Sequence, residues 1–323
     1  MRFAPILTLF LLASPALADF PQTVADHILP GYARFAAATG ALADQAAQDC
    51  NAATLRPAFD AAYDAWVAVQ HLRFGPVEQD GLGLSIAFWP DPKGSGAKAQ
   101  LGLLTGDPAA LTPDRFAEQS VAARGLTGLE RLLFPKAPLP ADPCALIRAT
   151  AADLARVAAQ VDQGWTDGYD LILLTAGEAG NTVFLTRSEV RQVLFTQIIA
   201  GLEFAKDQRL GRPMGSFETP HPERAEAVAS GRSQRNLVLS LQAMQAMVTT
   251  LSPDVPGTMA GFDRAVRLAT GLDDPVFAGV ATPTGRLRVE AVQQAVAALI
   301  DTALAELGPE LDVGIGFNAA DGD

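Results

Sequence analysis

The feature that most constrains the fold is the helical spacing of apolar residues along almost the whole chain. Alanine and leucine dominate the sequence, and few segments alternate with the two-residue period of a strand. Between residues 230 and 251, one stripe at helical spacing carries Leu237, Leu241, Met244, Val248 and Leu251. This pattern predicts an all-α protein.

Other helices are expected between irregular connections. The Gly- and Pro-rich segments 74–98 and 212–226 cannot each form one regular element. Helices are expected at about 23–50, 54–73, 124–134, 142–163 and 284–307, with shorter ones from Gln100, from Thr112 and within 168–211. Eight or more helices over this length favour two helical bundles rather than one.

A boundary between the bundles is expected near 164–169, which gives an N-terminal unit at 19–165 and a C-terminal unit at 166–323. The tripeptides Gly128-Leu129-Glu130 and Gly201-Leu202-Glu203 each stand in an expected helix that is followed by a Pro-containing break. This loose echo is compatible with a duplicated bundle. It is also compatible with chance, because Gly, Leu and Glu are common residues.

The chain begins MRFAPILTLFLLASPALADF, which has the order of a secretory signal peptide at 1–18. Arg2 is a short basic start, residues 6–13 are mostly apolar, and Ala16-Leu17-Ala18 is a small-x-small site. The apolar run is too short to anchor the chain across a bilayer. We expect cleavage after Ala18 and a soluble protein in the periplasm, with no membrane span.

Cysteine usage agrees with export. Cys50 and Cys144 are the two cysteines of the chain, and each lies near the end of an expected helix. In an oxidising compartment, two cysteines far apart in sequence most simply form one disulfide. The alternative is two separate buried thiols.

The charge balance is acidic, with 36 Asp and Glu against 24 Lys and Arg and a net charge of −12. No basic run is present, which argues against nucleic acid or an anionic membrane as a partner. An acidic surface suits cations, or simply solubility.

The segment RGLTGLERLLFP at 124–135 places a carboxylate, Glu130, in a helix that is otherwise suited to a core. The side chains three or four positions from Glu130 are Leu126, Thr127, Leu133 and Phe134. Burying an ionised carboxylate on such a stripe is costly unless another group pairs with it. We therefore expect Glu130 to be a site residue.

A second stripe suggests one partner for it. Phe59, Tyr63, Trp66, Gln70 and Arg73 follow one another at steps of three and four residues, so the sequence predicts a shared helix face. In one interpretation Arg73 ends the helix and extends to water. In the other, Arg73 reaches Glu130 or a ligand between them.

No familiar catalytic site is indicated. A zinc hydrolase needs about three protein ligands, and the three histidines, His27, His71 and His221, are not spaced as an HExxH helix would require. The nucleophile signature GxSxG is also missing from the sequence.

A further polar group occurs in LTRSEVRQVLF. Thr186 or Ser188 is expected to cap a helix that has Glu189 in its first turn. Alternatively, Glu189 and Arg191 belong to a polar patch that faces the other bundle.

Four segments resemble the imelysin-like periplasmic proteins. They are AYDAWVAVQHLRFGPVE, RGLTGLERLLFP, FAKDQRLGRPMGSFETPHPERAEAVASGRSQRN and the terminal LDVGIGFNAADGD. The resemblance covers almost the whole chain after the signal peptide. It implies two four-helix bundles of the up-and-down type joined by long irregular connections, export, and an association with iron acquisition.

The family's GxHxxE motif can be placed on the sequence. Gly125 matches the Gly and Glu130 matches the Glu, but Thr127 stands at the His position. A threonine hydroxyl is a much poorer transition-metal ligand than an imidazole. This departure puts in doubt both a metal site on Glu130 and the metallopeptidase activity that the family name implies.

The resulting hypothesis is an exported binding protein without catalysis that takes part in the uptake of iron or another ligand. The expected site lies between the bundles, with Glu130 and Thr127 at its centre, Gly125 beside them, and Gln70, Arg73, Glu189 or Arg191 nearby. The expected partners are a small ligand or a metal ion, iron or another divalent metal, and other iron-uptake proteins of the cell envelope. The alternatives are a metal-dependent peptidase and a periplasmic scaffold protein.

Overall fold

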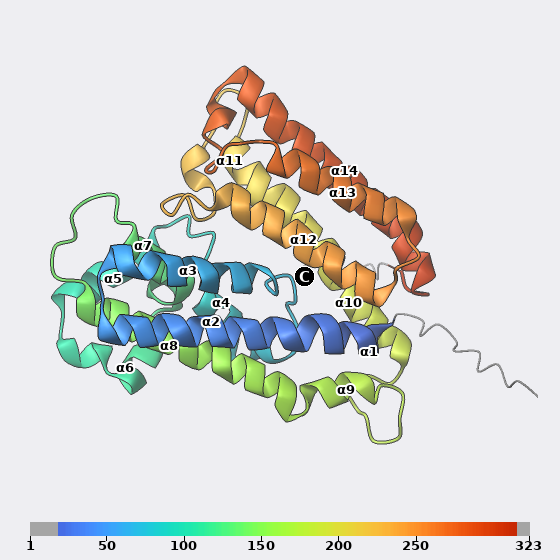
Figure 1. The fold of residues 1–323 in the computed structure, drawn as a ribbon, viewed down its shortest axis with the longest axis horizontal. Coiled ribbons are helices and arrows are strands. Elements are labelled where there is room, and N and C mark those ends of the chain that lie inside the picture. Colours follow the sequence, from blue (N-terminus) through green and yellow to red (C-terminus); the bar gives the residue numbers. More distant parts are fainter. Residues whose placement is uncertain (1–18, 315–323) are drawn as a thin grey trace, which may run out of the picture.

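Two groups of antiparallel helices make up residues 19–314, the part of the chain that the computed structural model describes (Figure 1). These residues contain no strand, and the all-α prediction is confirmed. The predicted signal peptide at 1–18 and the terminal GFNAADGD segment lie outside the described residues.

The N-terminal bundle consists of α2 (Leu29–Gln48), α3 (Ala52–Val67), α7 (Gly125–Leu133) and α8 (Cys144–Gly164). A short α1 (Phe20–Thr23) and a π-helical turn (Val24–Ile28) continue into α2 as one rod (Figure 1). The long connection between α3 and α7 contains α4 (Leu82–Ile86), α5 (Ser95–Thr105) and α6 (Pro113–Ala117). The predicted disulfide between Cys50 and Cys144 is present and joins the end of α2 to the start of α8.

The C-terminal bundle consists of α10 (Arg187–Glu203), α12 (Ser233–Leu251), α13 (Pro256–Thr270) and α14 (Pro283–Glu310). α9 (Asp170–Leu174) precedes it, and α11 (Arg212–Met214) follows a π-helical segment, Phe204–Gly211, that extends α10. The Gly-Leu-Glu tripeptides fall in the third helix of one bundle and the first helix of the other. They therefore do not occupy equivalent positions.

The region of the predicted boundary at 165/166 is helical. α8 continues through a π-helical turn, Trp165–Tyr169, into α9. Trp165 stacks on Tyr32 of α2, with ring centroids 5.6 Å apart, so this segment still packs on the N-terminal bundle. The chain passes to the second bundle within residues 175–186, and the division into two units stays a prediction.

One expectation for an individual helix was wrong, and one helix was missed. α3 ends at Val67, so Gln70 and Arg73 lie beyond the helix rather than on its face. Tertiary bonds hold the backbone there, because Tyr32 Oη donates to the Leu72 carbonyl and the Arg73 N–H donates to Gln197. α13 was not expected, because small residues such as Ala265 and Ala269 form much of its buried face and give a weak apolar signal.

Prolines account for two of the π-helical segments among the described residues. One residue separates Val24–Ile28 from Pro30, and one residue separates Phe204–Gly211 from Pro213. A proline ring clashes with the carbonyl four residues earlier and supplies no N–H to it, so the preceding turn widens. In the second segment, this widened turn carries Arg209 into the protein interior, where it is 3% exposed.

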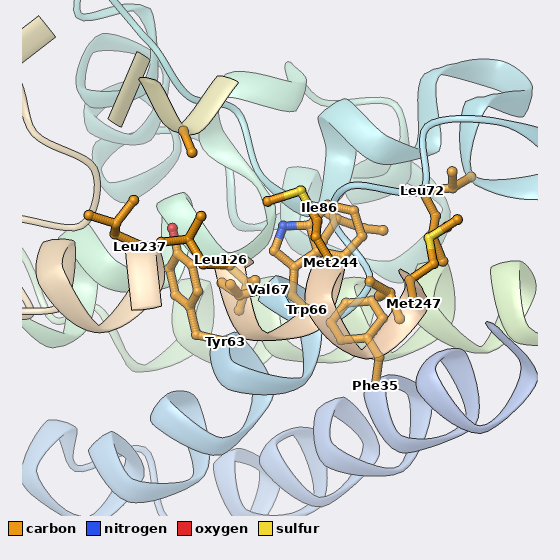
Figure 2. Close-up of a cluster of buried hydrophobic side chains, with 14 of the residues drawn as sticks. Phe35, Tyr63, Trp66, Val67, Leu72, Ile86, Leu126, Leu237, Met244 and Met247 are labelled. Atoms are coloured by element: carbon orange, nitrogen blue, oxygen red, sulfur yellow. The ribbon is translucent and has the colours of Figure 1, made fainter. Parts of the chain in front are cut away.

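The two bundles share one apolar core. Figure 2 shows Leu237, Met244 and Met247 of α12 among side chains of the N-terminal bundle, including Tyr63 and Trp66 of α3. Leu126 of α7 and Ile86 of α4 belong to the same cluster. α12 therefore packs against the N-terminal bundle within this shared core.

Among residues 19–314, no helix is both long and apolar enough to cross a membrane.

Candidate functional site

Glu130 lies on α7, of which every residue except Arg131 is buried. Its side chain is 8% exposed, and its Oε1 accepts hydrogen bonds from the Ser230 N–H at 2.9 Å and the Ser230 hydroxyl at 2.8 Å. Burial nevertheless raises the pKa of Glu130 above its ordinary value, and the nearby Glu226 acts in the same direction. The carboxylate is thus held by Ser230 but not neutralised by it.

The other two motif positions have different roles. Gly125 adopts φ +64°, and a Cβ there would lie 2.2 Å from the Ile86 carbonyl oxygen. Glycine is therefore required for α7 to start against the backbone of α4. Thr127 is 6% exposed, and its hydroxyl is buried without a hydrogen-bond partner among residues 19–314. An unpaired buried hydroxyl is costly, which makes Thr127 a position where a bound group would be stabilising.

A buried polar network lies behind Glu130. Arg209 donates through Nε to Glu226 at 2.8 Å and through Nη2 to the Gln70 side-chain oxygen at 2.5 Å. Asn236 of α12 also donates to Glu226, at 3.1 Å. These groups come from both halves of the chain, so the network crosses between the bundles.

Several atoms of this region have no partner in the described structure. The Tyr63 hydroxyl, Glu226 Oε1 and Asn236 Oδ1 are all buried and unpaired. Burial, together with Glu226 and Glu130, raises the pKa of Tyr63 well above its ordinary value, so the phenol stays protonated and can donate. Water or a ligand group would satisfy these atoms.

A cavity of about 1070 Å³ opens over Glu130 between the two halves of the chain. One wall comes from residues 89–104 and 130–140, and the other comes from Arg212 and residues 223–229. The Arg212 guanidinium lies 6.0 Å from the ring centroid of Trp89, and its Nε is buried without a partner. The cavity wall thus contains the buried carboxylate of Glu130. It also contains the guanidinium of Arg212, which pairs with no described residue.

Arg73 and Gln70 do not line this cavity. Both line a separate, smaller cavity of about 360 Å³ beside α10. Arg73 is exposed, and its guanidinium lies 5.3 Å from the ring centroid of Phe204. The expected approach of Arg73 to Glu130 is therefore wrong, because Glu130 is bonded to Ser230 instead.

Glu189 and Arg191 are also not brought to Glu130. The Thr186 hydroxyl caps α10 by accepting from the Glu189 N–H, and Glu189 accepts in return from the Leu185 N–H at 2.6 Å. Arg191 forms two hydrogen bonds of 2.9 Å to Asp19, the first described residue. These side chains hold the start of α10 and attach it to α1.

The side chains around Glu130 do not fit a bare transition-metal ion. Within residues 19–314, no group of three or more His, Cys, Asp and Glu side chains could hold a metal. A zinc-type site takes about three such ligands. One oxygen of Glu130 is already engaged by Ser230, and Thr127 offers only a hydroxyl.

Sequence reasoning missed four residues of the site: Arg209, Arg212, Glu226 and Ser230. All four stand in the segment FAKDQRLGRPMGSFETPHPERAEAVASGRSQRN. No spacing rule distinguishes them, because the π-helical turn and the irregular loop give them no helical periodicity. The unusual composition of this segment was the one sequence feature that could have pointed to these four residues.

Comparison with known proteins gives consistent matches over most of the chain. The sequence model of the imelysin family matches residues 28–303. Iron-regulated protein A of Synechococcus elongatus is 24% identical over 305 residues, which cover 85% of this chain and 81% of the relative.

Solved structures match the fold. An imelysin-like protein from Psychrobacter arcticum 273-4 superposes with a TM-score of 0.75 at 18% identity, covering 92% of this chain and 98% of the other. A protein from Parabacteroides distasonis ATCC 8503, assigned as an iron-regulated protein A precursor, gives a TM-score of 0.65 at 14% identity, covering 90% and 94%. At these identities the structural likeness supports the fold alone.

Proposed function

Because the chain belongs to the imelysin family, we propose that it is an exported periplasmic binding protein that takes part in iron uptake without catalysis. The iron-related role is carried over from the name of its relative, iron-regulated protein A. The observation that carries the binding role is the buried carboxylate of Glu130 in the wall of a cavity between the two halves of the chain.

The chemistry of the cavity favours a chelated ligand. Glu130 Oε1 is engaged by Ser230, and no described residue bonds to Oε2, which leaves one oxygen for a ligand donor or a metal. Arg212 offers a guanidinium that suits an acidic group. If the ferric ion arrives bound to a carboxylate chelator, the chelator supplies the metal ligands that the protein lacks.

The donors around Glu130 also support the proposal of a role without catalysis. A metallopeptidase would need a bound metal with an open coordination position and a group that activates water. The donors around Glu130 do not make up such a set. The Glu130 carboxylate is instead placed to recognise a ligand, with the Thr127 hydroxyl on the same helix as a further contact.

The first test titrates the purified exported protein with ferric citrate. Trp89 lines the cavity, so iron bound there should quench its fluorescence. We expect one equivalent to bind, and Glu130→Gln should weaken binding by about tenfold or more, the loss of one charged contact. Glu118→Gln is the matched control, because Glu118 is exposed on the surface.

Elemental analysis of the protein from its native exported fraction completes the test. Iron that is present in the parent protein and lost in Glu130→Gln supports the proposal. Equal ferric citrate binding by both proteins would place the site elsewhere. Peptide hydrolysis that depends on Glu130 and is sensitive to a chelator would instead favour a peptidase.

A further inference from the structure

The smaller cavity, of about 360 Å³, is separate from the Glu130 cavity. The ion pair between Arg209 and Glu226 stands between them. Arg209 lines the smaller cavity, whereas Ala225 and Ala227, on either side of Glu226, line the larger one. Phe204 of the smaller cavity also packs edge-on against Trp89 of the larger one, with ring centroids 5.8 Å apart. The two cavities are therefore neighbours with a shared wall.

The polar lining of the smaller cavity is rich in donors. It consists of Gln70, His71, Arg73, Gln197, Arg209 and Ser240, with no carboxylate among the lining residues. Arg209 is paired with Glu226, so Arg73 supplies the one guanidinium of this lining that no described carboxylate pairs with, in a protein whose net charge is −12. Such a lining favours an anion.

Arg73, Gln197 and His71 keep polar nitrogen atoms that no described residue bonds. Arg209 donates to Glu226 and Gln70, and the Ser240 hydroxyl donates to the Leu237 carbonyl. The Arg73 side chain makes no hydrogen bond or ion pair with any described residue, and Phe204 supports its guanidinium at 5.3 Å. The Gln197 side-chain oxygen accepts from the Arg73 N–H at 2.8 Å, and no described residue takes its amide donors. His71 is 7% exposed, and its Nδ1 is buried with no hydrogen-bond partner in the described part of the chain. This buried nitrogen, like the Arg73 guanidinium, would be satisfied by a bound group.

The rest of the lining is apolar. Val67, Phe204 and Met244 form most of it, with Ala200 and Gly201 of α10 leaving space for a ligand. A volume of this size is at the lower end of small-molecule sites. We propose that this cavity is a second binding site, specific for a small organic carboxylate whose acidic group meets Arg73 and whose apolar body packs on Phe204 and Met244.

Calorimetric titration of the full exported chain tests the proposal. The probes are acetate, hexanoate and benzoate, with benzamide as the uncharged counterpart of benzoate. We expect hexanoate or benzoate to bind with a stoichiometry of one, and benzamide to bind at least about tenfold more weakly. Arg73→Met should cause a loss of similar size, and Arg264→Met, at an exposed arginine of α13, should cause none.

A second variant tests the place of binding. Ala200 is exposed and lines the cavity, so Ala200→Trp should cover its entrance while the protein stays folded. We expect this variant to lose carboxylate binding and to keep the circular dichroism of the parent protein. Glu130→Gln should bind the carboxylate like the parent protein, which separates this site from the proposed iron-chelate site.

Three results would each overturn the proposal. One is a failure of all three carboxylates to bind at concentrations up to about 10 mM, a generous limit for ligands of this size. Another is equal affinity for benzoate and benzamide. The third is unchanged binding in both Arg73→Met and Ala200→Trp.

Discussion

The three motif positions on α7 are buried for different reasons. Gly125 is fixed by its backbone, which has a positive φ and lies against the carbonyls of α4. Glu130 is fixed by its hydrogen bonds to Ser230, and Thr127 has no polar partner among the described residues. The glycine therefore determines where α7 begins, and this start determines where the carboxylate lies.

Gly125→Ala should lower the free energy of unfolding by about 3 kcal/mol or more. The new Cβ would add left-handed strain and would meet the backbone oxygens of Ser85 and Ile86, which cannot rotate away. Gly102→Ala, in an open position inside α5, is the matched control and should be neutral or stabilising by up to about 1 kcal/mol. Urea unfolding measures both, and equal stability of the two variants would contradict the role given to Gly125.

The buried pair His27 and His71, whose Nε2 atoms are 3.2 Å apart, should make the protein sensitive to acid. Burial, helped by Arg34, lowers the pKa of His27 to about 4, and burial, helped by His27 and Arg209, lowers the pKa of His71 well below its ordinary value. Both side chains are neutral in the folded protein and gain protons on unfolding. Stability is therefore complete above about pH 6.5 and falls as the pH drops towards 4.

The expected slope is up to about 1.4 kcal/mol per pH unit for each histidine. Urea unfolding at pH 7, 6 and 5 measures it. The double variant His27→Leu, His71→Leu should lose less stability over this range than the parent protein. An identical pH dependence in the two proteins would show that other groups cause the acid sensitivity.

At the scale of the elements, the N-terminal bundle is closed by a covalent link between two neighbouring helices. α2 and α8 are antiparallel neighbours, and the disulfide between Cys50 and Cys144 joins them with Cα atoms 5.3 Å apart. The cysteines are 94 residues apart in sequence, so the link restricts a long loop of the unfolded chain. The long α3–α7 connection, which supplies part of one wall of the Glu130 cavity, lies entirely within that loop.

Replacing both cysteines by alanine should lower the free energy of unfolding by roughly 4 kcal/mol, the entropy of closing a loop of this length. The measurement is urea unfolding of the double variant against the oxidised parent protein. A reducing agent should destabilise the parent protein to a similar level and leave the variant unchanged. A difference below about 1 kcal/mol would mean that the unfolded chain is already restricted in this region.

At the scale of the whole molecule, ion pairs hold α12 against α3. Arg232, whose side chain is 4% exposed, pairs with Asp60 at 2.8 Å and with Asp64, and Arg235 pairs with Asp64 as well. Burial opposes ionisation of Asp64, but the hydrogen bonds from Arg235 and Arg232 outweigh it and lower the pKa of the carboxyl. These contacts add a polar rim to the apolar core that the bundles share.

Asp64→Asn should reduce the free energy of unfolding by about 1 kcal/mol at pH 7, since the pair is partly exposed. A carboxyl group whose pKa is lowered by folding stabilises the fold at pH values above its ordinary pKa. This contribution is lost as the pH falls through the lowered pKa. The difference between Asp64→Asn and the parent protein should therefore shrink below about pH 4. Asp44→Asn, at an exposed carboxylate of α2, is the control. It should leave the free energy of unfolding unchanged both at pH 7 and below about pH 4.

The sequence by itself determined the helices with strong apolar stripes, the disulfide and the burial of Glu130. Each rests on short-range information. Spacing of three and four residues fixes which side chains share a helix face, and two cysteines in a chain expected to be exported leave one simple pairing. α13 and the end of α3 could not be predicted in this way, because small residues and tertiary hydrogen bonds determine them.

Only the tertiary structure decided which groups meet. Ser230 lies 100 residues from Glu130 in sequence, and no local pattern relates the two. Arg73 shares a spacing with the α3 stripe, yet it lies at a different cavity, because the helix ends at Val67 and the chain turns towards Gln197. Burial of a carboxylate can be inferred from the residues beside it on one helix. Its partner cannot, because that depends on how α12 and the loop before it pack against α7.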